Sequence, residues 1–168
     1  MKPVPERIVN TVHQEFSGVQ IPELREKASD LHEEQPELMA FVQASISQVE
    51  GDAADLAVYL FFMVCRMYQE AYGDDVGVVE SSDIMTRYKE NEEQIEQLAQ
   101  REGDVEGHSF GLDTQQPHLI EYLMEVLKGA RDEEKENLDA GEQAYVFLIL
   151  STVMTVLNYA VKKAKETQ

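Results

Sequence analysis

The segment Ala144–Val161, AYVFLILSTVMTVLNYAV, constrains the fold more than any other stretch, because its eighteen residues carry no formal charge. At helical spacing Ser151, Thr155, Asn158 and Lys162 fall on one side and form a narrow polar seam, which leaves the rest of the circumference apolar. A helix that is apolar around most of its surface is normally enclosed by other helices of its own domain. We therefore predict that this segment is the central helix of an all-α core.

Two alternatives compete for the same segment. A tail anchor at 144–161 would suit the position near the C-terminus, before Lys162, Lys163 and Lys165. A membrane-spanning helix needs about 20 mostly apolar residues, however, and this run is marginal for that length. The other alternative is an apolar face that pairs two copies of the chain in a homodimer. We expect no membrane insertion and keep the homodimer as an alternative.

The charge balance limits the classes of partner. The chain has 33 acidic and 14 basic residues, with a net charge of −19. Nucleic-acid binding is not expected, because a phosphate backbone attracts clustered Lys and Arg. High like charge favours solubility, and it also suits a basic protein partner.

The single cysteine and the N-terminal residues indicate in which cellular compartment the protein is expected. The single Cys65 cannot form an internal disulfide, which is typical of a reducing environment, and its apolar surroundings predict a buried, inert thiol. The first ten residues contain Lys2, Pro3, Pro5 and Glu6 where a signal peptide would need an apolar run. We therefore expect a cytoplasmic protein.

The length fits one domain, residues 1–168, and the helical periodicity predicts a bundle of six to seven helices. Within the N-terminal part, Pro22–Glu34 reads as one helix. Four segments follow from the pattern: short N-terminal helices (1–34), a first hairpin (35–73), a peripheral helix with a loop (74–115) and a second hairpin (116–168).

The two hairpins share a motif. Gln35-Pro36-Glu37-Leu38 and Gln116-Pro117-His118-Leu119 both read Gln-Pro-x-Leu, and matched apolar positions follow each of them. Proline is favoured at the first position of a helix. We predict an internal duplication of two helix pairs, each burying its long apolar helix against the other.

The middle of the chain contributes a helix with a narrow apolar stripe. Ser82–Arg101 places Ile84 and Tyr88 on this stripe and carries charge on its other faces. The following stretch, Glu102–Thr114, has three glycines and no helical pattern, which is typical of a loop. The helix Ser82–Arg101 and the face led by Gln116–Glu125 are the expected contact surfaces, because both carry more charge than packing requires.

Candidate metal ligands are few. Di-metal helical bundles use Glu-x-x-His pairs, and none of the four histidines has a Glu three residues before it. The nearest pattern is His118-x-x-Glu121 with Glu125 one turn further on. A solvated helix edge gives the same pattern, so these three are weak candidates.

A second candidate set would suit a metal-dependent hydrolase that resembles the all-helical nucleotide pyrophosphohydrolases. In such a site, helix-borne carboxylates would hold Mg²⁺, which binds few carboxylates and keeps several waters. Glu93 and Glu96 offer a Glu-x-x-Glu spacing, and Glu136 and Asp139 offer Glu-x-x-Asp. These spacings arise easily in an acidic sequence, so the hydrolase is the alternative hypothesis.

No pattern identifies a catalytic reaction or a cofactor. The sequence has no glycine-flanked serine elbow, no Walker-type phosphate loop and no dinucleotide fingerprint. The favoured hypothesis is therefore a protein–protein interaction or regulatory module without catalytic activity, which binds a protein partner, in particular a basic one.

Overall fold

The computed structural model describes residues 2–102, 115–132, 138 and 140–166, and these residues form helices and connections without a strand. The all-helical bundle predicted from the sequence is confirmed. The elements are α1 (Glu6–Phe16), α2 (Ile21–Lys27), α3 (Ser29–Glu34), α4 (Pro36–Ile46), α5 (Gly51–Tyr72), the 3₁₀ turn η1 (Gly73–Asp75), α6 (Ser81–Glu102), α7 (Pro117–Asp132) and α8 (Ala140–Glu166).

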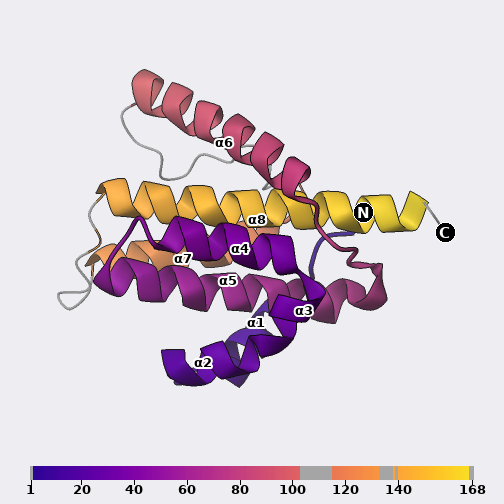
Figure 1. Cartoon of the computed structure of the whole chain (residues 1–168). Helices are drawn as coiled ribbons and strands as arrows, with labels where there is room; N and C mark the ends of the chain where they lie inside the picture. The colour runs from indigo at the N-terminus through magenta and orange to yellow at the C-terminus, as the bar shows by residue number, and fades with distance from the viewer. Residues whose placement is uncertain (1, 103–114, 133–137, 139, 167–168) are drawn as a thin grey trace.

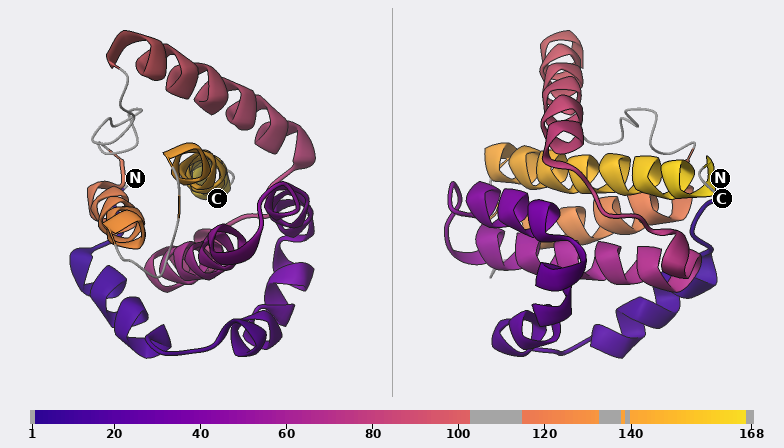
Figure 2. Two further views of the ribbon diagram at one scale, coloured as in Figure 1. Left: turned by 90° about the vertical axis from the view of Figure 1, so that its left-hand side faces the viewer. Right: turned by 45° about the vertical axis from the view of Figure 1, so that its right-hand side comes forward.

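Helix α8 is the centre of the bundle. It packs against α4, α5, α6 and α7, and seen end-on it is surrounded by the other helices (Figures 1 and 2). Ile149, Leu150 and Val153 have no exposed surface. The stretch Gly141–Glu166 is long and apolar enough to cross a membrane, but 78% of its most apolar window is buried within the bundle. The prediction of a central core helix is thus confirmed.

The N-terminal helices wrap around the side of α5 that faces away from α8 (Figure 2). The prediction of one helix over Pro22–Glu34 is wrong, because the chain turns at Ala28 and forms α2 and α3 instead. The Ala28 N–H donates to Leu24 O at 2.8 Å, and the Ala28 carbonyl accepts from the Leu31 N–H at 2.9 Å. This turn allows Leu24, which is fully buried, and the half-buried Leu31 to pack against the same core.

The two Gln-Pro motifs hold extended chain segments in place. Gln35 Oε1 accepts the Val79 N–H at 2.9 Å, and Gln35 Nε2 donates to Gly77 O at 2.8 Å. Gln116 Oε1 accepts the Val4 N–H at 2.9 Å. Both glutamines are buried and immediately precede the prolines that begin α4 and α7. Gln35 therefore fixes the segment that leads into α6, and Gln116 fixes the segment that leads into α1. The internal duplication of the two helix pairs stays a prediction.

Gln116 also belongs to a buried polar network at the end of the bundle. Its Nε2 lies 2.9 Å from Tyr72 Oη and 3.0 Å from Asn158 Oδ1. Tyr68 Oη lies 2.5 Å from the same Asn158 oxygen and donates to it. Burial raises the pKa of Tyr68 well above its usual value, so the phenol keeps its proton. The network joins α5, α8, the residue that precedes α7 and the extended segment at Val4.

Gly73 ends α5 in a backbone conformation that requires glycine. Its φ is 53° and its ψ is −126°, a combination that side chains disfavour. We expect Gly73→Ala to lower the free energy of unfolding by about 1–2 kcal/mol. Gly129 is the matched control, because it lies within α7 and an added Cβ there meets no atom within 4 Å. Gly129→Ala should raise the free energy of unfolding by about 0.5–1 kcal/mol. Urea unfolding of both variants checks this, and equal effects would contradict it.

Candidate binding groove

Two neighbouring hollows run along one side of α5. The first, of about 430 Å³, lies between α3, α5, α8 and the segment after α5. The second, of about 320 Å³, lies between α1, α2, α3 and α5. Leu31, Glu34 and Gln69 line both hollows, so the two hollows lie next to each other. We call the two adjacent hollows together the acidic groove.

The floor of the acidic groove is apolar. It includes Phe62, Cys65 and Tyr68 of α5 and Leu157 of α8, all of them buried. Burial raises the pKa of the Cys65 thiol far above its usual value, and the nearby charge of Glu34 raises the pKa further. The thiol therefore remains protonated and is a poor nucleophile. The predicted buried, free Cys65 is observed.

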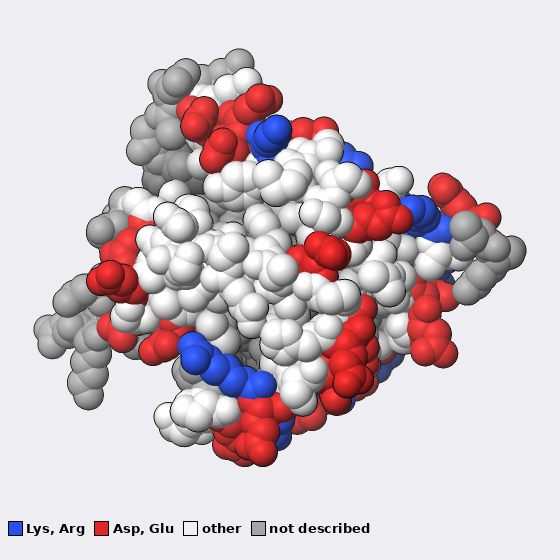
Figure 3. All heavy atoms as spheres, in the orientation of Figure 1, with Lys and Arg blue, Asp and Glu red and all other residues white. Residues whose placement is uncertain are grey.

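The rim of the groove is acidic. Figure 3 shows acidic side chains gathered around α3 on one face of the molecule. Of the two cationic side chains along the groove, Arg66 Nη2 lies 2.7 Å from Glu70 Oε1, and Lys27 Nζ lies 5.3 Å from the centre of the Phe16 ring. Five carboxylates line the groove: Glu15, Asp30, Glu33, Glu34 and Asp74.

An exposed valine borders the first hollow. Val78 is 68% exposed, although the chain around it is firmly held, because Gln35 bonds to Gly77 and Val79 on either side. Single exposed apolar residues are common on protein surfaces. Here the valine adjoins the apolar floor, so it extends the apolar surface that a bound segment would contact.

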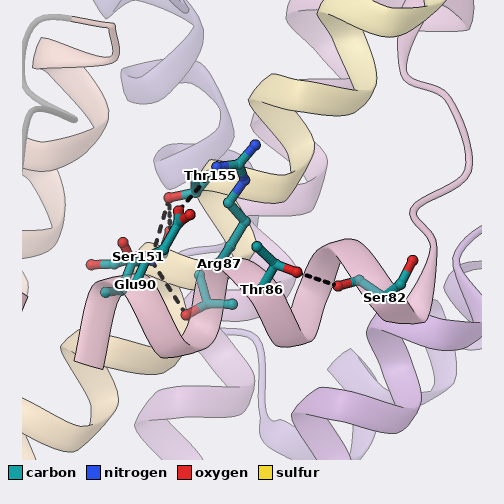
Figure 4. A network of polar contacts seen from close by, with 8 residues as sticks. Ser82, Thr86, Arg87, Glu90, Ser151 and Thr155 are labelled. Carbon is teal, nitrogen blue, oxygen red and sulfur yellow. Dashed lines mark hydrogen bonds and ion pairs between the residues drawn. The ribbon is translucent and has the colours of Figure 1, made fainter. Parts of the chain in front are cut away.

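Helix α6 packs against α8 and rises away from the bundle toward its own C-terminal end (Figure 1). Its contact with α8 includes polar side chains: Asn91 Nδ2 lies 3.4 Å from Thr155 Oγ1. Arg87 pairs with Glu90 of the same helix at 3.0 Å. Figure 4 also shows hydrogen bonds within each helix: Thr86 donates to the Ser82 carbonyl at 2.9 Å in α6, and Thr155 donates to the Ser151 carbonyl at 2.7 Å in α8. No hollow among those we describe is lined by α6 residues.

The weak metal candidates lie on two helices. His118, Glu121 and Glu125 are on α7, where His118 is half-buried and the carboxylates are exposed; Glu93 and Glu96 are exposed on α6. In the part of the chain that the structure describes, no three His, Cys, Asp or Glu side chains are grouped to hold a metal ion.

Some sequence predictions lie outside the described residues. These are the loop over 103–114 and the proposed ligands Glu136 and Asp139. At its start the loop prediction included Glu102, which is instead the last residue of α6.

The chain has no match among family models, curated proteins or solved structures. Interpretation of function therefore depends on the groove itself. Sequence reasoning missed its acidic residues on α1 and α3, because those helices read as short elements laid on a larger body. The one available signal was the run of charge next to Leu31 on α3, which is also typical of a solvated helix face.

Proposed function

We propose that the chain is a protein-binding module whose acidic groove receives a basic, amphipathic segment of a partner protein. The observation that carries this proposal is the combination of an apolar floor with five carboxylates along the rim. Apolar side chains of the segment would contact Phe62, Leu31 and Val78. Its Lys or Arg side chains would lie beside Glu34 and Asp74.

The charges favour such a partner at two ranges. At long range the net charge of −19 attracts a basic segment and speeds its association. At short range, in the described part of the chain, Glu33, Glu34 and Asp74 form no ion pair, so they are available to a partner. Exposed ion pairs contribute about 0.2–1 kcal/mol each. Affinity should therefore depend on burial of apolar surface as well, and it should fall as salt rises.

Cys65 in the floor of the groove does not favour thiol-based catalysis, because the thiol is buried and held protonated. Hydrogen bonds and an ion pair within the chain hold the walls of the groove in place. Gln35 fixes the wall at Gly77 and Val79, and Arg66 is already paired with Glu70.

We expect a synthetic amphipathic helical peptide of leucine and lysine to bind saturably to the whole chain. Neutralising two rim carboxylates, Glu34→Gln with Asp74→Asn, should weaken binding about fivefold to tenfold, since two exposed ion pairs are lost. Fluorescence anisotropy of the labelled peptide measures the dissociation constant.

The matched control is Glu93→Gln with Glu96→Gln, which removes the same charge from the exposed face of α6. This control should change the dissociation constant by less than about twofold, the part due to net charge alone. Equal weakening by the two pairs of substitutions would show general attraction to an acidic surface and would overturn the proposal. Val78→Ser should also weaken binding if the peptide occupies the groove.

A further inference from the structure

A third hollow lies on the side of α2 and α3 that faces α4. It differs from the acidic groove because no described Asp or Glu lines it. It has a volume of about 380 Å³ and is enclosed by α2, α3, α4 and α5. Its interior is apolar and includes Leu24, Val42, Phe61 and Phe62, which are all buried. We call it the apolar hollow.

The polar side chains around the apolar hollow are basic or uncharged, whereas most charged residues of the chain are acidic. Arg25 and His32 stand on the α2–α3 side, and Gln43 and Ser47 stand on the α4 side. All four are exposed, and Arg25, His32 and Gln43 can donate hydrogen bonds to a ligand, whereas the Ser47 hydroxyl donates to the Ala44 carbonyl at 2.6 Å. Of the described residues that line the hollow, none is Asp or Glu, although the chain has 33 acidic residues. The hollow thus joins an apolar interior to a rim of donors that includes a permanent cation.

We propose that the apolar hollow binds a small amphipathic carboxylate, with its hydrocarbon chain inside and its carboxylate at Arg25 and His32. The apolar chain would replace water against Phe61, Phe62 and Val42. The carboxylate would accept charge-assisted hydrogen bonds from the Arg25 guanidinium. In figure 3, basic side chains lie beside a hollowed area over the lower part of the face shown, where α2 is located.

The volume of the apolar hollow fits a small molecule. A volume of about 380 Å³ is at the lower end of the range for ligand pockets, roughly 300–1,000 Å³. An α-helix with its side chains is about 10–12 Å across and needs a long open groove. The hollow is also bounded by α2, α3 and α4 on three sides, which suits one short chain that enters from the rim.

A tryptophan reporter makes the test direct, because the natural chain has no tryptophan. Ala44→Trp places the only indole beside the rim of the hollow, at an exposed position of α4 that does not line the hollow. Titration of this variant with dodecanoate, below the concentration at which it forms micelles, should change the fluorescence saturably. Dodecanol should bind about tenfold more weakly, because it lacks the charge that Arg25 recognises.

The variant Arg25→Gln with His32→Gln, in the same reporter background, should weaken dodecanoate binding about tenfold and leave dodecanol binding unchanged. Lys27→Gln is the matched control, because Lys27 lies on α2 but lines the neighbouring acidic groove. It should leave both affinities unchanged. All of these residues are exposed, so the variants are expected to fold, and thermal unfolding checks that.

Three outcomes would overturn the proposal: no saturable change with dodecanoate, equal affinity for dodecanoate and dodecanol, or equal weakening by Lys27→Gln. If the leucine–lysine peptide changes the reporter fluorescence and dodecanoate does not, the hollow is a peptide site and the proposal is also wrong. Phe62 borders both the apolar hollow and the acidic groove, but Arg25 and His32 line only the apolar hollow, and Glu34 and Asp74 line only the acidic groove. Each pair of charge substitutions therefore tests one proposal, and either proposal can fail without the other.

Discussion

Met154→Ala is expected to lower the free energy of unfolding by about 2–5 kcal/mol. The Met154 side chain has no exposed surface and lies in the middle of α8, which four other helices contact. Truncation removes buried methylene and thioether groups, and the surrounding core relaxes only partly around the cavity left behind. Urea unfolding followed by circular dichroism measures the change.

Met85→Ala is the control for this prediction, because it makes the same chemical change on α6, where Met85 is 49% exposed. Its effect should be within about 0.5 kcal/mol. If the two methionine variants lose similar stability, α8 is not enclosed as the structure has it. A small effect of Met154→Ala alone would contradict the central position of the helix.

Gln116→Leu is expected to lower the free energy of unfolding by about 2–4 kcal/mol, since it leaves the buried Val4 N–H without its acceptor and removes two further hydrogen bonds from the buried network. The substitution removes the acceptor of the Val4 N–H and the donor to Asn158 Oδ1. Tyr72 Oη loses its contact with Gln116 as well, but keeps its bond to the Lys2 carbonyl at 2.7 Å. The first residues should consequently detach from the bundle before the rest unfolds.

Two measurements test the consequences of Gln116→Leu. Chemical denaturation gives the loss of stability, and hydrogen exchange should show faster exchange of the Val4 amide. The neighbouring Gln115→Leu is the control, because Gln115 is exposed and its bonds to described residues, Asn158 and Lys162, are 3.4 Å and 3.5 Å long. Gln115→Leu should cost less than about 1 kcal/mol. Equal costs would mean that the buried network contributes little.

The fold followed largely from hydrophobic periodicity. The uncharged run Ala144–Val161 predicted a central helix, and the structure places it there as part of α8. Pro36 and Pro117 marked the starts of α4 and α7 correctly, because proline is well suited to the first helical turn. The break at Ala28 was not predictable, because no Gly or Pro marks it and it arises from packing against α5.

The Gln-Pro motifs show where periodicity is insufficient. Gln35 and Gln116 were noticed as a shared pattern, but their role depends on Val79 and Val4, which are distant in sequence. A long-range hydrogen bond has no periodic signal, so only the structure reveals it.

The candidate sites were less predictable than the fold. The acidic groove combines carboxylates from α1, α3 and the turn after α5, which are separated by many residues in the sequence. The expected contact surfaces were instead α6 and the start of α7. Gln116 of that second surface is fully buried and acts in the structural network. Residue charge alone did not distinguish a solvated helix face from the rim of a groove.

The most direct test of the proposed function is to map the binding of the leucine–lysine peptide by nuclear magnetic resonance of the isotopically labelled chain. The proposal predicts that chemical-shift changes concentrate at the acidic groove, around Leu31, Phe62, Gln69 and Val78. They should disappear when the lysines of the peptide are replaced by glutamate. Changes spread evenly over the acidic surface, or centred on α6, would contradict the proposal that the groove is the binding site.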